Sequence, residues 1–351
     1  MNITSHKFKV DQSLNEAYRP PEEFMTFLKG AKRILIIGHQ NPDGDALGSA
    51  LALGMALKNS GRNISVGYSG ILPSSLEFLT GGKDFLSSVD FSPELALKYD
   101  LLVMVDCRDI SRVWPECEAL SQDELPPFLS VDHHADTTPN RFKACFINHQ
   151  AAATAELIFK ILEELEAEFT PPIVESLLAA LISDTGSFSQ ANSTAECLRQ
   201  ASFLVSRGGD IEHINHYIKR NWSETKMRLL TEALATITLH FQGRLATMLV
   251  TQEMLDRTGA CVSETEGLVE YPLLLRGVDI VALLKVNGHG QTRVSLRSRP
   301  GLDVRELAKS QGGGGHNQAA AYIDPYLDPE ESLKVLLNIV ETTLEPHVKQ
   351  E

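Results

Sequence analysis

Short apolar runs alternate with helical patterns along the first half of the chain. Apolar positions spaced three and four apart predict helices at Ala46–Asn59 and Ala152–Ala167. Short runs rich in branched residues and bounded by turn signals predict buried strands at Arg33–Gly38, Asn63–Gly67, Leu101–Val105 and Phe128–Val131. This alternation indicates an α/β fold, in which helices cover both faces of a parallel sheet and ligand sites lie beyond the carboxyl ends of the strands.

The pattern changes after residue 190, where helical spacing continues without strands. Helices are predicted at Ser193–Ser206 and Ile211–Lys219, and the polar helical stretch Ser223–Leu239 is typical of a connector. A smaller α/β unit follows, with strands predicted at Arg244–Val250, Val278–Val286 and Arg293–Arg297 and a closing helix at Pro329–Leu344. We therefore divide the chain into an N-terminal extension (1–30), a parallel-sheet domain (31–222), a helical linker (223–239) and a second domain (240–351).

Composition is consistent with two globular domains. The chain has 351 residues, of which 43% are hydrophobic and 22% are charged. No apolar stretch approaches the roughly 20 residues of a membrane span, and the polar N-terminus has no signal-peptide core, so we expect a cytoplasmic protein without membrane contact. The five cysteines form no Cys-x-x-Cys pair, so neither a disulfide framework nor a zinc–thiolate site is predicted.

The net charge of −14 argues against binding to long nucleic acid, whose backbone requires many lysine and arginine contacts. An anionic substrate must then be small or must meet a local basic patch. One segment is basic, because six cations face only Asp303 and Glu306 there: Lys285, Arg293, Arg297, Arg299, Arg305 and Lys309. By charge counting alone, an ordinary solvated face remains an equal alternative.

Potential metal ligands gather where the first predicted strand ends. The segment "IGHQNPDGDALGS" places His39, Asp43 and Asp45 in a loop marked by Pro42 and Gly44. Carboxylates with one imidazole suit a divalent ion such as Mn²⁺ or Mg²⁺ better than a closed structural zinc site. The alternative is that Asp43 serves only in a turn or as a helix cap.

Three further apolar elements end in the same kind of residue. Asp106 follows one strand, "DHH" at 132–134 follows another, and Asp184 follows an apolar helical run. Each acid or imidazole alone could be a cap or a solvated turn residue. Four such endings within one α/β half favour a shared site.

These motifs together resemble the DHH/DHHA1 phosphoesterase family, and within it the branch of nanoRNases and 3′-phosphoadenosine-5′-phosphate (pAp) phosphatases. The resemblance runs from about residue 30 and keeps the order and spacing of five motifs, "GHQNPDGDALGS", "VD", "DHH", "SDTGSF" and "GGGGH". It implies two divalent metal ions, for which we expect Mn²⁺, with Mg²⁺ or Co²⁺ as alternatives. The implied ligands are His39 and Asp43 for one ion, Asp45, His133 and Asp184 for the other, and a bridging Asp106.

The resemblance also implies catalytic roles. His134 would contact the scissile phosphate, Asp132 would support the histidines, and Asp106 would hold both ions. Two divalent ions roughly 4 Å apart can clamp the phosphoryl oxygens during in-line displacement. A bridging carboxylate offsets the repulsion between the two ions.

The second domain is expected to choose the substrate. Gly312, Gly313, Gly314 and Gly315 precede His316, and such a run lets the backbone approach a ligand and turn its N–H groups toward an anion. The alternative, a flexible linker, fits poorly with the amphipathic and alanine-rich segments on either side. By resemblance this motif and Arg297 bind the terminal phosphate of a nucleotide. Ala321 stands where many family members have glycine, which leaves the fine substrate fit open.

The leading functional hypothesis is an enzyme that degrades oligoribonucleotides of roughly two to five nucleotides from the 5′ end to nucleoside 5′-monophosphates and converts pAp to AMP. A stand-alone phosphodiesterase for cyclic or linear dinucleotides is the second hypothesis, and a non-catalytic nucleotide sensor is the third. A processive single-strand DNA exonuclease and a pyrophosphatase are less consistent with the motifs. By analogy, the exposed helical segments after residue 190 suggest a homodimer.

Overall fold

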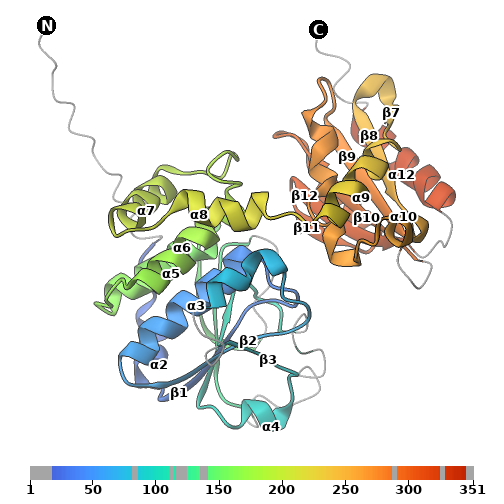
Figure 1. Cartoon of the computed structure of the whole chain (residues 1–351). Helices are drawn as coiled ribbons and strands as arrows, with labels where there is room; N and C mark the ends of the chain where they lie inside the picture. The colour runs from blue at the N-terminus through green and yellow to red at the C-terminus, as the bar shows by residue number, and fades with distance from the viewer. Residues whose placement is uncertain are drawn as a thin grey trace, which may run out of the picture. The chain divides into compact units, whose positions relative to one another are not determined.

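The computed structural model describes residues 18–80, 86–110, 114, 125–134, 141–286, 291–324 and 329–344. The chain divides after Asn221 into two compact units, unit 1 and unit 2 (Figure 1). Within the described ranges, no helix is both long and apolar enough to cross a membrane.

Unit 1 contains a parallel sheet, which confirms the predicted α/β class. Six strands appear in its described part: β1 (Arg33–Ile37), β2 (Asn63–Tyr68), β3 (Leu86–Ser88), β4 (Leu101–Val105), β5 (Phe128–Asp132) and β6 (Phe142–Ile147). Their order in the sheet is β3-β2-β1-β4-β5-β6, and neighbouring strands are parallel. The chain order reverses between β1 and β4, and ligands of such sheets bind outside the carboxyl ends of the strands at this point.

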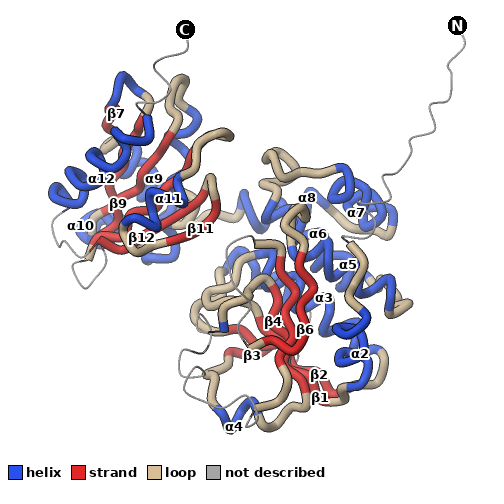
Figure 2. Tube along the Cα trace, turned by 180° about the vertical axis from the view of Figure 1, so that it is seen from behind, coloured by secondary structure: helices blue, strands red, loops and turns tan. Residues whose placement is uncertain are grey.

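Apolar clusters lie on both faces of this sheet, which explains why its central strands β1 and β4 are almost uniformly apolar. Ile34 and Ile36 of β1 face one cluster, whereas Leu35 and Ile37 face the other. The described helices are α2 (Glu22–Gly30), α3 (Gly44–Asn59), α4 (Pro93–Ala96), α5 (Thr154–Glu164), α6 (Pro171–Asp184), α7 (Ala195–Ser206) and α8 (Ile211–Asn215). Figure 2 shows the strands of this sheet, among them β1, β4 and β6, beside α2, α3, α5 and α6, and α4 on the other side of the sheet.

Two glycines let α3 and α6 approach each other closely. A Cβ atom at Gly44 would lie 2.5 Å from the Cβ atom of Ser183, and one at Gly48 would overlap the carbonyl oxygen of Ser176. Glycine is therefore required at both positions. Because the two helices pack so closely, the first turn of α3, with Asp45, lies beside the last turn of α6, with Asp184.

Unit 2 contains a mixed sheet of order β11-β12-β10-β9-β8-β7. Only β8 and β9 pair in parallel among its described strands. The strands are β7 (Thr238–His240), β8 (Leu245–Val250), β9 (Ile280–Val286), β10 (Thr292–Ser298), β11 (Gly314–His316) and β12 (Ala319–Asp324). The helices are α9 (Glu224–Leu234), α10 (Gln252–Thr258), α11 (Val304–Ser310) and α12 (Pro329–Leu344).

The segment expected as a helical connector has a different structure. The helix α9 ends at Leu234 and the chain turns into β7, which pairs with β8. The prediction of a helix to Leu239 is wrong because the β-branched run 236–238 favours a strand. Leu229 and Ala233 of α9 are buried with β8 in a core cluster of unit 2, so α9 belongs to this unit. In the same way, Phe24 of α2 is buried in the main core of unit 1, so this helix of the expected N-terminal extension belongs to unit 1.

Candidate metal centre

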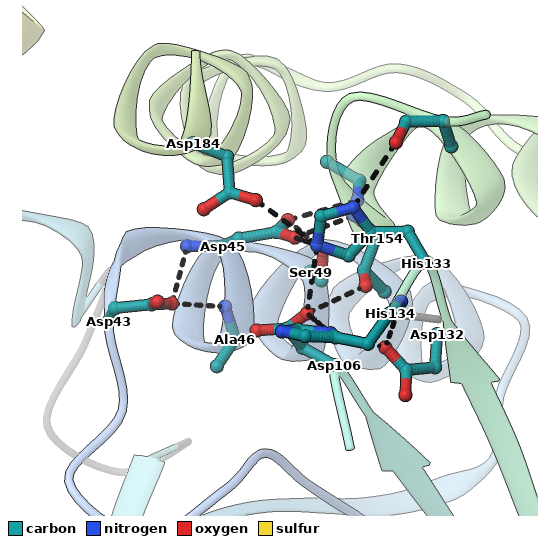
Figure 3. Close-up of polar contacts among 12 residues, drawn as sticks. Asp43, Asp45, Ala46, Ser49, Asp106, Asp132, His133, His134, Thr154 and Asp184 are labelled. Atoms are coloured by element: carbon teal, nitrogen blue, oxygen red, sulfur yellow. Dashed lines mark hydrogen bonds and ion pairs between the residues drawn. The ribbon is translucent and has the colours of Figure 1, made fainter. Parts of the chain in front are cut away.

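The eight residues predicted for the site in unit 1 lie together at the carboxyl ends of neighbouring strands. They come from the loop after β1, the residues after β4, the end of β5 and the helices α3 and α6: His39, Asp43, Asp45, Asp106, Asp132, His133, His134 and Asp184. Figure 3 labels all of them except His39. Because β1, β4 and β5 are adjacent in the sheet, their ends meet at one point.

Among the described residues, three sets of side chains offer donor atoms within 4.8 Å of one another. The sets are His39, Asp43 and Asp106; Asp45, His133 and Asp184; and Asp106, His133 and His134. Asp106 belongs to the first and the third set, and its Oδ1 atom lies 3.5 Å from His133 Nε2 of the second. The first two sets are the groups that we expected to hold one ion each, and the ions themselves stay a prediction.

Asp43 has two roles. Its Oδ1 atom caps α3 by accepting hydrogen bonds of 3.0 Å from the backbone N–H groups of Asp45 and Ala46. Its Oδ2 atom lies 3.7 Å from His39 Nε2. Burial alone would lower the pKa of His39, but Asp43 and Asp106 raise it to about 9. In the sequence, a helix cap was the alternative to a ligand role for Asp43. In the structure the cap fixes the direction of the Asp43 carboxylate, so the two roles are compatible.

Asp45 is fully buried and is held by the N-terminus of α5. Its Oδ2 atom accepts a 2.6 Å bond from Thr154 N, and its Oδ1 atom accepts bonds of 3.0 Å from Ala155 N and Ser49 Oγ. The positive end of a helix stabilises such a carboxylate. Burial and the nearby charge of Asp106 nevertheless raise the pKa of Asp45 well above its usual range.

Asp106 lies at the centre of the cluster with an unusual backbone. Its φ angle is +58°, a region that residues other than glycine rarely occupy. Such strain persists where the surroundings enforce it and often marks functional sites. Thr154 Oγ1 donates a 2.9 Å hydrogen bond to Asp106 Oδ1. Burial and the charge of Asp43 raise the pKa of Asp106 well above its usual range.

Each histidine of the pair 133–134 is oriented by a partner on its Nδ1 atom. His133 Nδ1 lies 3.2 Å from the carbonyl oxygen of Ala151, so Nε2 faces the carboxylates and lies 3.5 Å from Asp106. His134 Nδ1 lies 2.7 Å from Asp132 Oδ1. Burial would raise the pKa of Asp132, but the hydrogen bond and charge of His134 hold it below its usual value. Partners of this kind set which imidazole nitrogen can act.

Arg108 contacts both Asp132 and the backbone of His134, and the sequence analysis did not identify it. Its side chain is 5% exposed, its Nε atom lies 3.3 Å from Asp132 Oδ2, and its terminal nitrogen donates a 2.5 Å bond to the carbonyl oxygen of His134. A buried cation needs such partners. Its place two residues after Asp106 was the only signal that could have identified it.

Two further polar residues of the site were also missed. Thr154 begins α5 and binds both Asp45 and Asp106, but the expected start of this helix at Ala152 hid its position. Asn192 Nδ2 donates a 3.0 Å bond to the carbonyl oxygen of Asp184 and a 3.1 Å bond to that of Ala152. No local pattern distinguishes Asn192 from a surface loop residue.

The glycine run of unit 2 differs from the predicted anion cradle. The N–H groups of Gly312 and Gly313 donate to the carbonyl oxygens of Lys309 and Ala308 at the end of α11, so the prediction that they face an anion is wrong for these two. A Cβ atom at Gly313 would overlap the carbonyl oxygen of Ala321, whereas one at Gly314 would meet nothing within 4 Å. The side chain of His316 lies outside the described part of the structure.

Arg297 lies on β10, in the middle of the sheet of unit 2. Its Cα partner on β12 is Ala319, and Ala321 of the same strand pairs with Gly314 of β11. Burial lowers the pKa of Arg297. The strands on one side of Arg297, β12 and then β11, therefore carry small residues at these positions.

Family models match both units. The model of the DHH family, N-terminal domain, matches residues 33–183, and that of the DHHA1 domain matches residues 248–345. The chain is 30% identical over 313 residues to the bifunctional oligoribonuclease and PAP phosphatase NrnA of Thermus thermophilus, covering 89% of this chain and 90% of that protein. It is 25% identical to the cyclic-di-AMP phosphodiesterase GdpP of Geobacillus thermodenitrificans, over 82% of this chain and 44% of that protein.

A solved structure has the same fold. The exopolyphosphatase-related protein of Bacteroides fragilis superposes with a TM-score of 0.85 at 23% identity, covering 96% of this chain and 98% of that one. Fold and site together define a hydrolase of phosphate esters. The chain belongs to the DHH family, with a DHHA1 domain following the DHH domain.

Proposed function

We propose that the cluster holds two divalent metal ions and that the enzyme hydrolyses short phosphorylated nucleotides. It would cleave oligoribonucleotides of a few nucleotides to nucleoside 5′-monophosphates and would remove the 3′-phosphate of pAp to give AMP. The observation that carries this proposal is the position of Asp106, whose Oδ2 atom lies 3.6 Å from His39 Nε2 of the first set and whose Oδ1 atom lies 3.5 Å from His133 Nε2 of the second. The names of the similar proteins, an oligoribonuclease and PAP phosphatase among them, support it.

The donor set suits divalent cations. Asp45 and Asp106 are buried carboxylates whose pKa values are raised by burial and by neighbouring acids, so positive charge between them would relieve both effects. Carboxylates with imidazoles, and no cysteine, favour Mn²⁺, with Mg²⁺ or Co²⁺ as alternatives. When bound, the ions would stabilise negative charge on the phosphate and activate a water molecule for attack.

The residues of the chain itself would orient the reaction. Asp132 holds Nδ1 of His134, so that Nε2 can donate to an oxygen of the scissile phosphate. Arg108, whose Nε atom lies 3.3 Å from Asp132 Oδ2, would hold this carboxylate in place. Thr154 would keep the carboxylate of Asp106 directed between His39 and His133. Fixed polar groups of this kind reduce the reorganisation that the transition state needs.

Unit 2 would bind the terminal phosphate of the substrate. Arg297 offers a planar cation for two parallel hydrogen bonds, and open space at Gly314 would let a ligand reach the backbone. A small substrate is compatible with a chain of net charge −14, because only a few local cations must neutralise it. Exclusion of long nucleic acid, a cytoplasmic location and a homodimer stay predictions.

A second candidate function is a stand-alone cyclic-dinucleotide phosphodiesterase. Its support is the similarity to GdpP, which is named a cyclic-di-AMP phosphodiesterase. A nucleotide sensor without turnover is the third candidate. A competition assay separates them: the purified chain with Mn²⁺ receives equal amounts of pAp, pApA and cyclic di-AMP, and the products are resolved over time.

Loss of pAp and pApA to AMP before the cyclic compound is the expected result. Preferential loss of cyclic di-AMP would replace the leading proposal with the second candidate. Binding of these compounds without turnover of any of them would favour the sensor.

A further inference from the structure

The six cations of the basic segment separate into two classes in the structure. Three are engaged by acceptors on other elements or in their own helix. Arg299 donates to the carbonyl oxygens of Leu273 and Leu275, Arg305 pairs with Asp303 at 3.2 Å, and Lys309 pairs with Glu306 at 3.3 Å. Half of the six cations therefore make ordinary structural contacts.

The other three cations share one face of the sheet of unit 2. On β10, Val294 and Leu296 are buried in the core cluster that includes residues of α11 and α12. Because side chains alternate along a strand, Arg293 and Arg297 point to the opposite face. Lys285 of β9 is the direct cross-strand partner of Arg293, so it lies on this face as well.

Lys285 and Arg293 form a like-charged pair that makes no ion pair with a carboxylate among the described residues. Like charges directly opposite each other on neighbouring strands destabilise a sheet. Burial lowers the pKa of Lys285, and the charge of Arg293 lowers it further. Lys285 donates to Thr265 Oγ1 at 3.0 Å, but neither cation has a carboxylate within 4.0 Å in the described ranges. The repulsion between the two cations is a cost to folding that binding of an anion would offset.

The acids nearest to this face are too distant to pair with it. Glu266 raises the pKa of Lys285, and Glu266 and Glu270 partly offset the effect of burial on Arg297. Neither carboxylate forms an ion pair with the three cations among the described residues. The face therefore keeps its positive charge.

We propose that Lys285 and Arg293 form a second phosphate subsite, separate from the position of Arg297, that binds the third phosphate of an oligonucleotide. This inference rests on the proposed function. Arg293 lies directly opposite Lys285, whereas Arg297 lies four residues further along β10, roughly 13 Å away, opposite Val281. The face therefore offers two positions for two phosphates of one substrate.

The number of phosphate groups then decides which substrates use the subsite. In pAp and in pApA there are two phosphates, one for hydrolysis and one for Arg297. The trinucleotide pApApA carries a third. The pair Lys285 and Arg293 would therefore set a preference for substrates of three nucleotides or more.

Kinetics on pAp, pApA and pApApA test this inference. The double variant Lys285→Ala/Arg293→Ala should lower the ratio of kcat/KM for pApApA to kcat/KM for pAp by about tenfold or more, mainly through KM. Arg293→Gln, which keeps much of the side-chain volume, should lower the same ratio in the same direction. Arg228→Ala is the matched control, because Arg228 of α9 is exposed and pairs with Glu224 at 2.6 Å, and it should leave the ratio unchanged.

Loss of repulsion should keep the thermal unfolding midpoint of the double variant at or above that of the wild type. An unchanged ratio in a folded double variant, with an active wild type, overturns the subsite and leaves the proposed function intact. An equal loss on all three substrates also overturns it. A wild type that turns over none of them overturns the proposed function, and the subsite with it.

Discussion

Thr154 Oγ1 donates a 2.9 Å hydrogen bond to Asp106 Oδ1, across 48 positions of the chain. The backbone N–H of the same threonine donates a 2.6 Å bond to Asp45 Oδ2. One residue at the start of α5 thus fixes two buried carboxylates from different elements. These two hydrogen bonds hold the residue after β4 and the first turn of α3 in fixed positions at the site.

Replacement of Thr154 should weaken catalysis without unfolding the chain. Thr154→Val removes the hydroxyl but keeps the shape and the backbone N–H, so kcat for pAp should fall by about 10- to 100-fold. Thr154→Ser keeps the donor and should retain most of the activity. Steady-state kinetics with Mn²⁺ measure both. A valine variant as active as the serine variant would show that this hydrogen bond has no catalytic role.

Asp106→Asn should abolish turnover and preserve the fold. Asparagine tolerates a positive φ angle and removes a charge that burial and Asp43 disfavour, so unfolding without added metal should not shift to lower temperature. Turnover of pAp should fall by at least about 1,000-fold, since the carboxylate that lies between His39 and His133 would lose its charge. Differential scanning fluorimetry and phosphate release measure the two effects. A variant that keeps a tenth of the wild-type activity would contradict a central role of Asp106 in catalysis.

Neighbouring glycines of unit 2 should respond differently to alanine. Gly313→Ala should lower the thermal unfolding midpoint, because its Cβ atom would overlap the backbone of β12. Gly314→Ala meets open space and should keep the midpoint within about 1 °C while it raises KM for pAp, since the methyl group would occupy the ligand's place. Equal midpoints for the two variants, or an unchanged KM for Gly314→Ala, would contradict this division.

Glu156 should make stability depend on pH. This carboxyl group is fully buried, it accepts a 2.6 Å bond from Ala152 N, and burial raises its pKa from 4.5 to about 7. The folded chain therefore holds a proton that the unfolded chain releases. The contribution to stability is present below pH 4.5 and is lost as pH rises to about 7, by roughly 3 kcal/mol in total.

Glu156→Gln isolates this effect, because glutamine keeps the acceptor and cannot ionise. Urea unfolding of both chains between pH 4.5 and 7.5 should show the wild type losing stability relative to the variant as pH rises. A constant difference between the two chains would contradict the raised pKa.

The sequence predicted most of unit 1 because its signals are local. An apolar strand followed by Asp or His is visible as a pattern, and parallel strands bring their carboxyl ends together without further information, which explains how His39, Asp106 and His133 were found. Arg108 and Thr154 act through contacts across the sheet or between helices, and no spacing in the chain encodes such contacts.

The second unit was predicted less completely for a related reason. The glycines at 312 and 313 were expected to serve a ligand, but the end of α11 takes their N–H groups, and only the pairing of β11 with β12 shows which glycine stays open. The like-charged pair of Lys285 and Arg293 depends on the register of β9 and β10. Charge counting could not separate it from the paired cations nearby.

The most direct test of a metal-dependent phosphoesterase centred on Asp106 is phosphate release from pAp by chain stripped of divalent ions with a chelator, as Mn²⁺ is returned stepwise. The wild type should be inactive without metal and should regain turnover with a saturable dependence on Mn²⁺, whereas Asp106→Asn should stay inactive at every concentration. Turnover by the metal-free wild type, or equal recovery in the variant, would contradict the assignment of this cluster as the catalytic metal centre.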